Sequence, residues 1–257
     1  MRYLLFPLYA PLASWGDVAV GEFRPSFNYP SRSALLGLLG AALGLQRSDE
    51  EAHAALSAGC GVAVAMYEEG CLLRDYHTAQ IASQSIFEDQ PRRVRADELQ
   101  VPLEKRKEHL QTILSTRDYR QDAVSLVCLW CKHDLPRWPL EKLRKDLDEP
   151  KYVLYLGRKS CPPALPLKPQ IVEADDIQAA LVLAAPQLDK LAAQLGRKTP
   201  LILRRVAWEE GAQPGYQATF SVPRKDDVRS RRRWQFSDRV EHVALIASEE
   251  SASEENA

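Results

Sequence analysis

The sequence predicts an α+β fold, and the order of its apolar segments supports this class. Strand-forming residues dominate three short runs in the first third of the chain, at Arg2–Tyr9, Gly61–Tyr67 and Cys71–Thr78. The first two runs are separated by helical segments, and the last two flank Glu68-Glu69-Gly70, which is a hairpin signal. A helix at Leu140–Leu147 continues the order to βαββαβ. This is the order of a ferredoxin-like (RRM-like) domain.

The stretch from Arg24 to Gly44 predicts the first helix. Pro30 disfavours helical backbone just before it, and Ser31 or Ser33 can cap the helix that follows. The helix is almost wholly apolar, and its three glycines each cost about 1 kcal/mol relative to alanine, which suggests close packing against a sheet. Its start combines free backbone N–H groups, Arg32 and two hydroxyls. This corner is either a phosphate site or the end of a tightly packed core helix.

The rest of the chain predicts an arm and a C-terminal part. Residues 79–122 are polar and too long for a loop of a compact domain, so we interpret them as a projecting hairpin, or thumb. Later strands either form a second, smaller sheet or extend the first. The predicted division is an RRM-like domain at 1–170 with the thumb inserted at about 79–122, a β-rich part at 171–247 and a disordered acidic tail at 248–257. In the first domain we also expect a helix at Asp49–Ser57. In the C-terminal part we expect helices at Ile177–Ala185 and Gln187–Leu195, and strands at Leu201–Ala207, Tyr216–Val222 and His242–Ala247.

Composition narrows the class of protein. Five cysteines, an odd number, and no visible secretory signal predict a reducing cytoplasm. The CxxC at Cys128 and Cys131 lies in a run typical of a buried strand and lacks enough neighbouring ligands for zinc, so we expect no metal and no cofactor. The apolar run of the first helix is too short to span a membrane. The chain has no Walker loop, HExxH or GxSxG in a suitable setting, which gives no support to ATP hydrolysis, zinc proteolysis or hydrolase chemistry.

Charge is unevenly distributed although the net charge is only −1. The run Arg224–Arg233 is strongly basic and is followed at once by Trp234 and Phe236, and residues 92–120 hold eight basic side chains. Local basic patches with adjacent aromatic rings are typical of proteins that bind a polyanion. A solvated surface is the alternative for any one patch.

The stretch from Lys151 to Pro169 predicts a ligand loop. Two tyrosines precede Gly157-Arg158-Lys159-Ser160. Glycine lets backbone approach a ligand, basic side chains contact phosphate, and tyrosines offer stacking faces. The alternative is a structural loop that joins two halves of the chain.

Five separated blocks together resemble the CasD family, a subunit of the type I-E CRISPR surveillance complex Cascade. They are Trp15-Gly16, the stretch Arg24–Gly44, LRDYHT at Leu73–Thr78, TILSTRDYRQDA at Thr112–Ala123, and YLGRKSCP at Tyr155–Pro162 with the following PL. The resemblance covers residues 1–170 well and the remainder weakly. It implies an RRM-like fold with a thumb, and a cytoplasmic, non-catalytic subunit that holds the 5′ handle of CRISPR RNA and caps the complex for antiviral defence. The implied partners are that RNA, the backbone and large subunits of Cascade and, indirectly, target DNA, with no membrane.

Residue types within the matched blocks give the predicted RNA contacts. Single-stranded RNA is held by aromatic stacking and by hydrogen bonds to phosphates. The expected stacking faces are Trp15, Phe27, Tyr119 and Tyr155. The expected phosphate contacts are Arg24, Arg32, Arg117, Arg120, Arg158 and Lys159, helped by Ser33, Ser160 and the Gly157 backbone. We further expect the start of the first helix and the loop after Tyr155 to meet, so that Arg32 and Arg158-Lys159 hold successive phosphates.

The sequence is also compatible with two other functions. One is a metal-independent endoribonuclease that processes CRISPR repeat RNA, in which His77, Tyr76 and Lys159 supply acid–base groups. A lone histidine at the end of a strand is more often a hydrogen-bonded structural residue. The other is an interaction subunit whose basic patches meet acidic proteins and not RNA.

Overall fold

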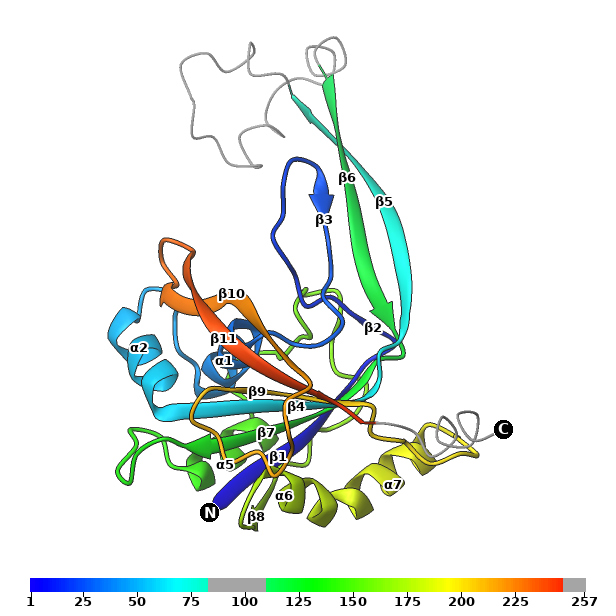
Figure 1. Cartoon of the computed structure of the whole chain (residues 1–257). Coiled ribbons are helices and arrows are strands. Elements are labelled where there is room, and N and C mark those ends of the chain that lie inside the picture. The colour runs from blue at the N-terminus through cyan, green and yellow to red at the C-terminus, as the bar shows by residue number, and fades with distance from the viewer. Residues whose placement is uncertain (83–109, 247–257) are drawn as a thin grey trace.

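A computed structural model describes residues 1–82 and 110–246 of the chain. It contains a main sheet, covered by helices on both faces, and a narrow second sheet that projects from it (Figure 1). The tip of the predicted thumb and the predicted acidic tail lie outside the described residues. Among the described residues, no helix is both long and apolar enough to cross a membrane.

The main sheet has seven strands, and every neighbouring pair is antiparallel. The predicted α+β class is therefore confirmed in its general form. In spatial order the strands are β10 (Phe220–Ser230), β11 (Gln235–Leu245), β9 (Arg205–Glu209), β4 (Cys60–Glu68), β7 (Val124–Cys131), β1 (Arg2–Tyr9) and β8 (Gln170–Glu173).

Helices cover both faces of the central strands because those strands are apolar on both sides. On β1, Leu4, Phe6 and Leu8 pack in one core cluster, whereas Tyr3 and Leu5 pack in the other. The first cluster contains side chains of α1 (Arg32–Leu43), α2 (Glu50–Gly59) and α5 (Leu140–Asp148). The second contains side chains of α6 (Ile177–Leu183) and α7 (Ala185–Gln194). Successive side chains of a strand point to opposite faces, so β1 contributes to two separate cores.

Helix α1 begins where its sequence predicts. Ser31 is the N-cap, and its hydroxyl accepts a hydrogen bond of 3.2 Å from the Ala34 N–H. Gly44 ends the helix in the left-handed conformation, with φ +77°. The glycines do not mark packing against a sheet, however. Gly37 lies against the Arg231 side chain and Gly40 against His53 of α2, so their missing Cβ atoms admit neighbouring side chains.

The predicted hairpin of β4 and the following strand is wrong. β4 pairs with β7 and β9, and the strand after Gly70 leaves the main sheet. The reason is burial: nearly every residue of β4 is buried, whereas the next strand is largely exposed and cannot lie beside a central strand. Gly70 makes this turn at φ +69°, where an added Cβ would clash with the backbone of residues 121 and 123.

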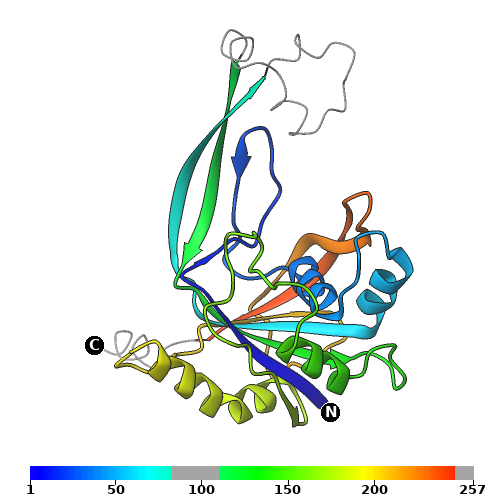
Figure 2. The same cartoon turned by 180° about the vertical axis from the view of Figure 1, so that it is seen from behind.

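The second sheet is built on a long ribbon formed by β5 (Cys71–Ala82) and β6 (Leu110–Gln121). The short strands β2 (Leu12–Ala13) and β3 (Phe23–Arg24) pair with β6 near the base and side of this ribbon. The ribbon rises well clear of the main sheet in both views (Figures 1 and 2).

The C-terminal strands extend the main sheet and do not make a separate one, because β9 pairs directly with β4. The basic run Arg224–Arg233 forms the second part of β10 and most of the turn that leads to β11. These two strands form the outer hairpin, which lies at the edge of the sheet, and β10 packs on α1 and α2. The division of the chain at residue 170 stays a prediction.

Candidate nucleic-acid interface

The loop after Tyr155 packs against the protein's own backbone at the base of the ribbon. Gly157 has φ +86°, and a Cβ at this position would overlap the carbonyl oxygen of Ser14. The Ser14 N–H donates to the Leu156 carbonyl at 3.0 Å, and the Leu156 N–H donates to the Cys161 carbonyl at 2.7 Å. Gly157 therefore permits a close approach, but the approaching group is Ser14 and not a ligand.

Arg158 connects this loop to two strands of the second sheet. Its guanidinium donates to the carbonyls of Asp118 on β6, at 3.2 Å, and of Arg24 on β3, at 3.0 Å. The same group lies 4.6 Å from the centre of the Tyr119 ring, a cation–π distance. Arg158 thus positions the loop, and because its partners are carbonyls, no carboxylate in these contacts neutralises its charge.

Asp118 is the buried centre of the ribbon base. Arg74 of β5 donates two hydrogen bonds, of 2.9 and 3.1 Å, to the Asp118 carboxylate. Its carbonyl accepts from the Ser14 hydroxyl as well as from Arg158. The hydrogen bonds from Arg74 to the Asp118 carboxylate raise the pKa of Arg74. The ribbon, the loop and the segment at Ser14 are therefore held as one unit.

Several predicted contact residues lie on the surface of this unit. Tyr155 is 39% exposed, and Arg24, Lys159 and Ser160 are exposed. Arg117 is half-buried on β6, with its Nε atom 3.2 Å from the Ser115 hydroxyl. The Arg158 bond to Arg24 brings the loop beside β3. This surface, which we call the ribbon-base surface, contains Arg24, Arg117, Tyr155, Lys159 and Ser160.

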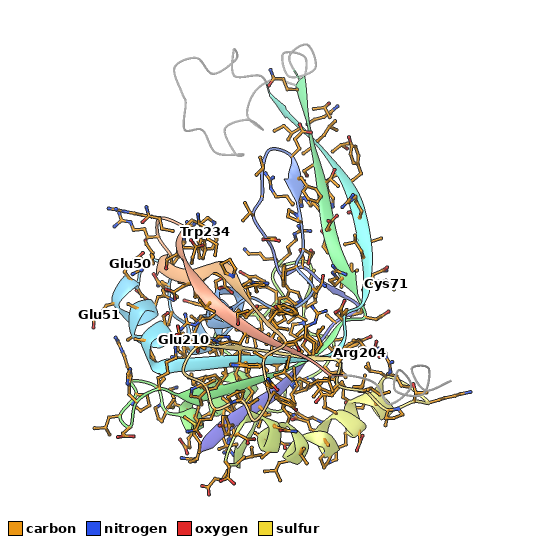
Figure 3. The ribbon with its side chains drawn as sticks, in the orientation of Figure 1. Glu50, Glu51, Cys71, Arg204, Glu210 and Trp234 are labelled. Carbon is orange, nitrogen blue, oxygen red and sulfur yellow. The ribbon has the colours of Figure 1, made fainter. Side chains whose placement is uncertain are left out.

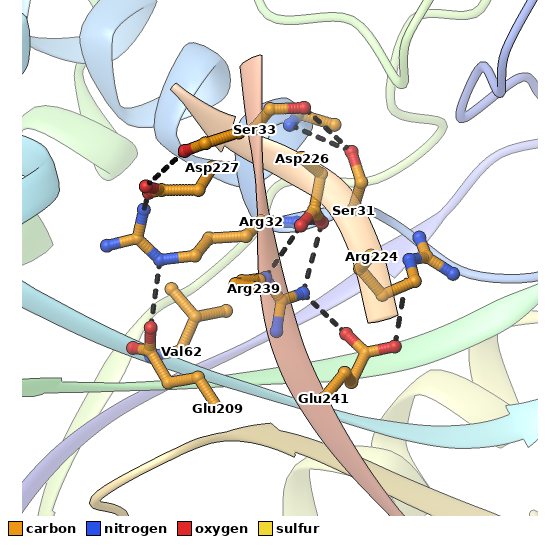
Figure 4. Close-up of polar contacts among 12 residues, drawn as sticks. Ser31, Arg32, Ser33, Val62, Glu209, Arg224, Asp226, Asp227, Arg239 and Glu241 are labelled. Carbon is orange, nitrogen blue, oxygen red and sulfur yellow. Dashed lines mark hydrogen bonds and ion pairs between the residues drawn. The ribbon is translucent and has the colours of Figure 1, made fainter. Parts of the chain in front are cut away.

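The start of α1 is filled by the protein's own carboxylates, contrary to the prediction for Arg32 (Figure 4). Arg32 is only 4% exposed. Its guanidinium contacts Glu209 at 2.9 Å and Asp227 at 3.0 Å, and it also donates to Ser57. The Arg32 N–H donates to Asp226 at 2.7 Å. The anion expected at this helix terminus is therefore Asp226, and Arg32 is a core residue with its donors satisfied.

The carboxylates at α1 come from the outer hairpin and belong to a wider buried network (Figure 4). Arg239 donates to both oxygens of Asp226, at 2.6 and 3.0 Å, and to Glu241 at 2.5 Å. Burial alone lowers the pKa of Arg239, but the bonds to Asp226 outweigh it and raise that pKa. The Tyr29 hydroxyl donates to Glu241 at 2.6 Å, and burial raises its pKa. The network fastens β10 and β11 to α1.

Comparison with known proteins identifies the family. The chain matches the family described as CRISPR-associated protein (Cas_Cas5) over residues 3–240. It is 34% identical over 192 residues to the CRISPR system Cascade subunit CasD of Escherichia coli (strain K12), in an alignment that covers 72% of this chain and 77% of that protein. This chain belongs to the CRISPR-associated Cas5 family. The resemblance to CasD that the sequence blocks predict is confirmed.

Two solved structures share the fold of this Cas5-family chain. A chain of a structure titled "CRISPR RNA-guided surveillance complex" has a TM-score of 0.56 and 23% identity, covering 95% of this chain and 89% of its own. A structure titled "Crystal structure of Cas protein" has the same TM-score and identity, covering 96% of both chains. At this level of identity the likeness extends to the fold alone.

Three of the predicted stacking faces in this Cas5-family protein are covered. Trp15 is only 7% exposed and packs in the core, and its backbone N–H donates to the Ser26 hydroxyl. Tyr119 is buried under Arg158. Phe27 is half-buried between Tyr29, at a ring distance of 4.9 Å, and Arg224, at 3.6 Å. Aromatic residue type alone did not separate core rings from exposed ones.

Two further predicted contacts are also engaged within the Cas5 fold. The Arg120 side chain donates to the Asn28 amide oxygen, and its buried Nε has no hydrogen-bond partner in the described structure. The Ser33 hydroxyl lies 3.0 Å from that of Ser31, while its carbonyl accepts from Arg231.

The predicted meeting of α1 and the loop after Tyr155 occurs only indirectly. Arg231, in the turn of the outer hairpin, binds the Ser33 carbonyl and lies against Gly37. Burial lowers the pKa of Arg231, and the neighbouring Tyr155 hydroxyl partly offsets this effect. Arg231 therefore stands between the helix and Tyr155. The site prediction omitted this residue although its basic run was recognised, because the run's position beside α1 depends on long-range strand pairing.

Proposed function

We propose that this protein is a subunit of a CRISPR RNA-guided surveillance complex and that it holds the 5′ handle of CRISPR RNA without cutting it. Membership of the Cas5 family and the similarity to the Cascade subunit CasD support the general role. The observation that carries RNA binding is the ribbon-base surface, where Arg158 holds the loop next to β3 and leaves Tyr155, Lys159 and Ser160 accessible.

The proposal includes the finer fold assignment. In chain order β1, α1, β4, β7, α5 and β8 give βαββαβ, and their order in the sheet is β4-β7-β1-β8. Helices α1 and α5 pack in the same core cluster. We assign these elements as a ferredoxin-like (RRM-like) core, with the ribbon of β5 and β6 inserted between its second and third strands as the thumb.

The chemistry of the ribbon-base surface suits an unpaired RNA strand. Tyr155 offers a ring on which a base can stack, and such stacking tolerates any base because every base has a π-face. Arg24 and Lys159 are exposed cations for phosphate oxygens, and Ser160 adds a hydroxyl donor. In the proposed complex the projecting ribbon reaches toward the backbone and large subunits, and target DNA is contacted only indirectly.

Binding of the full chain to handle RNA tests this proposal. Tyr155→Ala removes one stacking face and should weaken binding about 5- to 150-fold, since loss of such a face costs about 1–3 kcal/mol. The control is Arg137→Ala. The exposed side chain of Arg137 lies away from this surface and pairs with Glu51, at a distance of 3.5 Å. Circular dichroism confirms folding of each variant. Parent-like binding by folded Tyr155→Ala would overturn the assignment of this surface.

A nuclease function has one supporting observation, because His77 Nε2 lies 2.5 Å from an Asp75 carboxylate oxygen. A histidine oriented by a carboxylate is a common acid–base arrangement. Tyr76, however, is adjacent to His77 on a strand and so faces the other side of the ribbon. We expect His77→Ala to leave processing of repeat RNA unchanged in the assembled system. Loss of cleavage with assembly intact would favour the nuclease.

A further inference from the structure

The turn between β10 and β11 carries an exposed tryptophan among arginines. Trp234 is 59% exposed, and its backbone φ is +56°, a region that bulky side chains rarely adopt. Arg231, Arg232 and Arg233 precede it. Figure 3 shows Trp234 at the upper end of the outer hairpin, remote from the ribbon. We call Arg47 and residues 231–234 the arginine–tryptophan turn.

The backbone of this turn is held in place by groups from outside the hairpin. Arg47 donates to the carbonyls of Arg231, at 2.9 Å, and Arg232, at 3.2 Å. Glu50, the first residue of α2, accepts from the Arg232 N–H at 2.7 Å and from the Ser230 hydroxyl at 3.0 Å. A turn fixed in this way is preorganised, so less conformational freedom is lost when a ligand binds.

The side chains of the turn present a cationic aromatic surface. The Arg47 guanidinium lies 4.7 Å from the Trp234 ring centre, and that of Arg231 lies 6.0 Å away. Phe236 extends the aromatic surface at a ring distance of 6.0 Å. Both Arg47 and Arg231 donate to backbone carbonyls, so these bonds leave their charges in place. Glu50 contributes one negative charge, against four arginines.

We propose that the arginine–tryptophan turn is a second contact for single-stranded nucleic acid, in which Trp234 stacks an unpaired base and the arginines hold the flanking phosphates. An exposed ring surrounded by guanidinium groups is the pattern by which proteins bind unpaired strands. Carboxylates of an acidic protein segment would use the charges, but they offer no planar ring for the exposed tryptophan. The site lies on the outer hairpin and shares no residue with the ribbon-base surface. The inference rests on the proposed function only in taking the ligand to be a nucleic acid.

The test measures binding of the full chain to fluorescein-labelled oligouridine and to oligothymidine of equal length. Trp234→Asn removes the ring and suits the positive φ, so the fold is retained. Affinity should fall about 5- to 150-fold, and Trp234→Phe should restore most of it. Loss with both strands assigns any single strand as the ligand, whereas loss with oligouridine alone assigns RNA. Arg137→Ala is again the control.

The outcomes separate this inference from the proposed function. If the parent binds and Trp234→Asn binds equally well, the second contact is overturned while the handle surface stands. If Trp234→Asn loses affinity and Tyr155→Ala does not, the handle surface fails and the second contact stands. A parent that binds neither strand overturns the second contact, while binding of handle RNA still tests the handle surface by itself. If Trp234→Asn keeps its RNA affinity but loses binding to polyglutamate, the turn is a protein contact and the inference is wrong.

Discussion

The start of α1 and the base of the ribbon are both arginine-rich, yet their arginines have different partners. At α1, Arg32 and Arg239 are held by the carboxylates of Glu209, Asp226, Asp227 and Glu241. At the ribbon base, Arg74 is paired with the Asp118 carboxylate, but Arg158 is held by two carbonyls and a tyrosine ring. Carboxylates cancel the charge of an arginine, whereas carbonyls only orient it. The first region is therefore a neutralised core, and the second keeps a positive surface.

The contrast extends to the arginine–tryptophan turn, where Arg47 and Arg231 are also held by carbonyls. A count of basic residues in a sequence block does not distinguish these cases. The partner of each arginine decides whether it can attract a phosphate, and those partners come from segments far away in the chain.

The largest effect expected from this comparison is on stability, from Arg32→Ala. The substitution leaves Glu209 and Asp227 partly uncompensated, with Glu209 buried, and breaking a buried ion pair by removing one partner costs about 3–5 kcal/mol. Chemical denaturation measures the free energy of unfolding. The control is Arg137→Ala, which breaks an exposed pair and should cost less than about 1 kcal/mol.

An Arg32→Ala variant that unfolds like the parent but binds handle RNA less tightly would contradict this assignment. Arg32 would then be a phosphate contact, as its place at a helix start first suggests.

A smaller loss of stability is expected from Gly157→Ala. The new methyl group would meet the Ser14 carbonyl, and φ +86° is itself unfavourable for alanine, so we expect a cost of about 2 kcal/mol or more. Gly196→Ala is the matched control, because Gly196 has φ +66° with open space around it. Thermal unfolding should therefore separate the two variants. Equal midpoints would show that the loop does not depend on its contact with Ser14.

The local elements of the fold were predictable because their signals are local. Ser31 caps α1 as its position before an apolar run indicates, and Gly44 ends the helix. Strand pairing was less predictable. The segment after Gly70 has a strand-like composition, but it pairs with β6 and not with β4, and most of its side chains are exposed. Hairpin signals give a turn and do not identify which strand lies alongside.

The candidate site was predictable in part for a related reason. The block from Tyr155 to Ser160 does reach the surface beside β3. Arg32 and Trp15 belong to equally informative blocks, but both are buried by segments distant in sequence. Asp226 and Asp227, which neutralise the start of α1, lie about 195 residues from Arg32, and no local pattern connects them.

The smallest expected effect concerns acid stability of the outer hairpin. The Arg232 N–H and the Ser230 hydroxyl lower the pKa of Glu50 below its usual value of 4.5. A lowered pKa in the folded state adds stability that is present above pH 4.5 and is lost as the pH falls through the folded pKa. Thermal midpoints of the parent should therefore fall slightly more between pH 5 and pH 3 than those of Glu50→Gln, by about one degree. Parallel curves would argue that Glu50 does not fasten the turn.

One lysine from each region tests directly whether the partner of a cation decides its contact with RNA. Lys159 is exposed on the ribbon-base surface, whereas Lys132 contacts the Glu209 carboxylate at 3.0 Å. The measurement is the slope of log affinity for handle RNA against log salt concentration for the two alanine variants. We expect Lys159→Ala to make the slope shallower by about 0.7 to 1, and Lys132→Ala to leave it unchanged. A shallower slope for Lys132→Ala with an unchanged slope for Lys159→Ala would contradict this expectation.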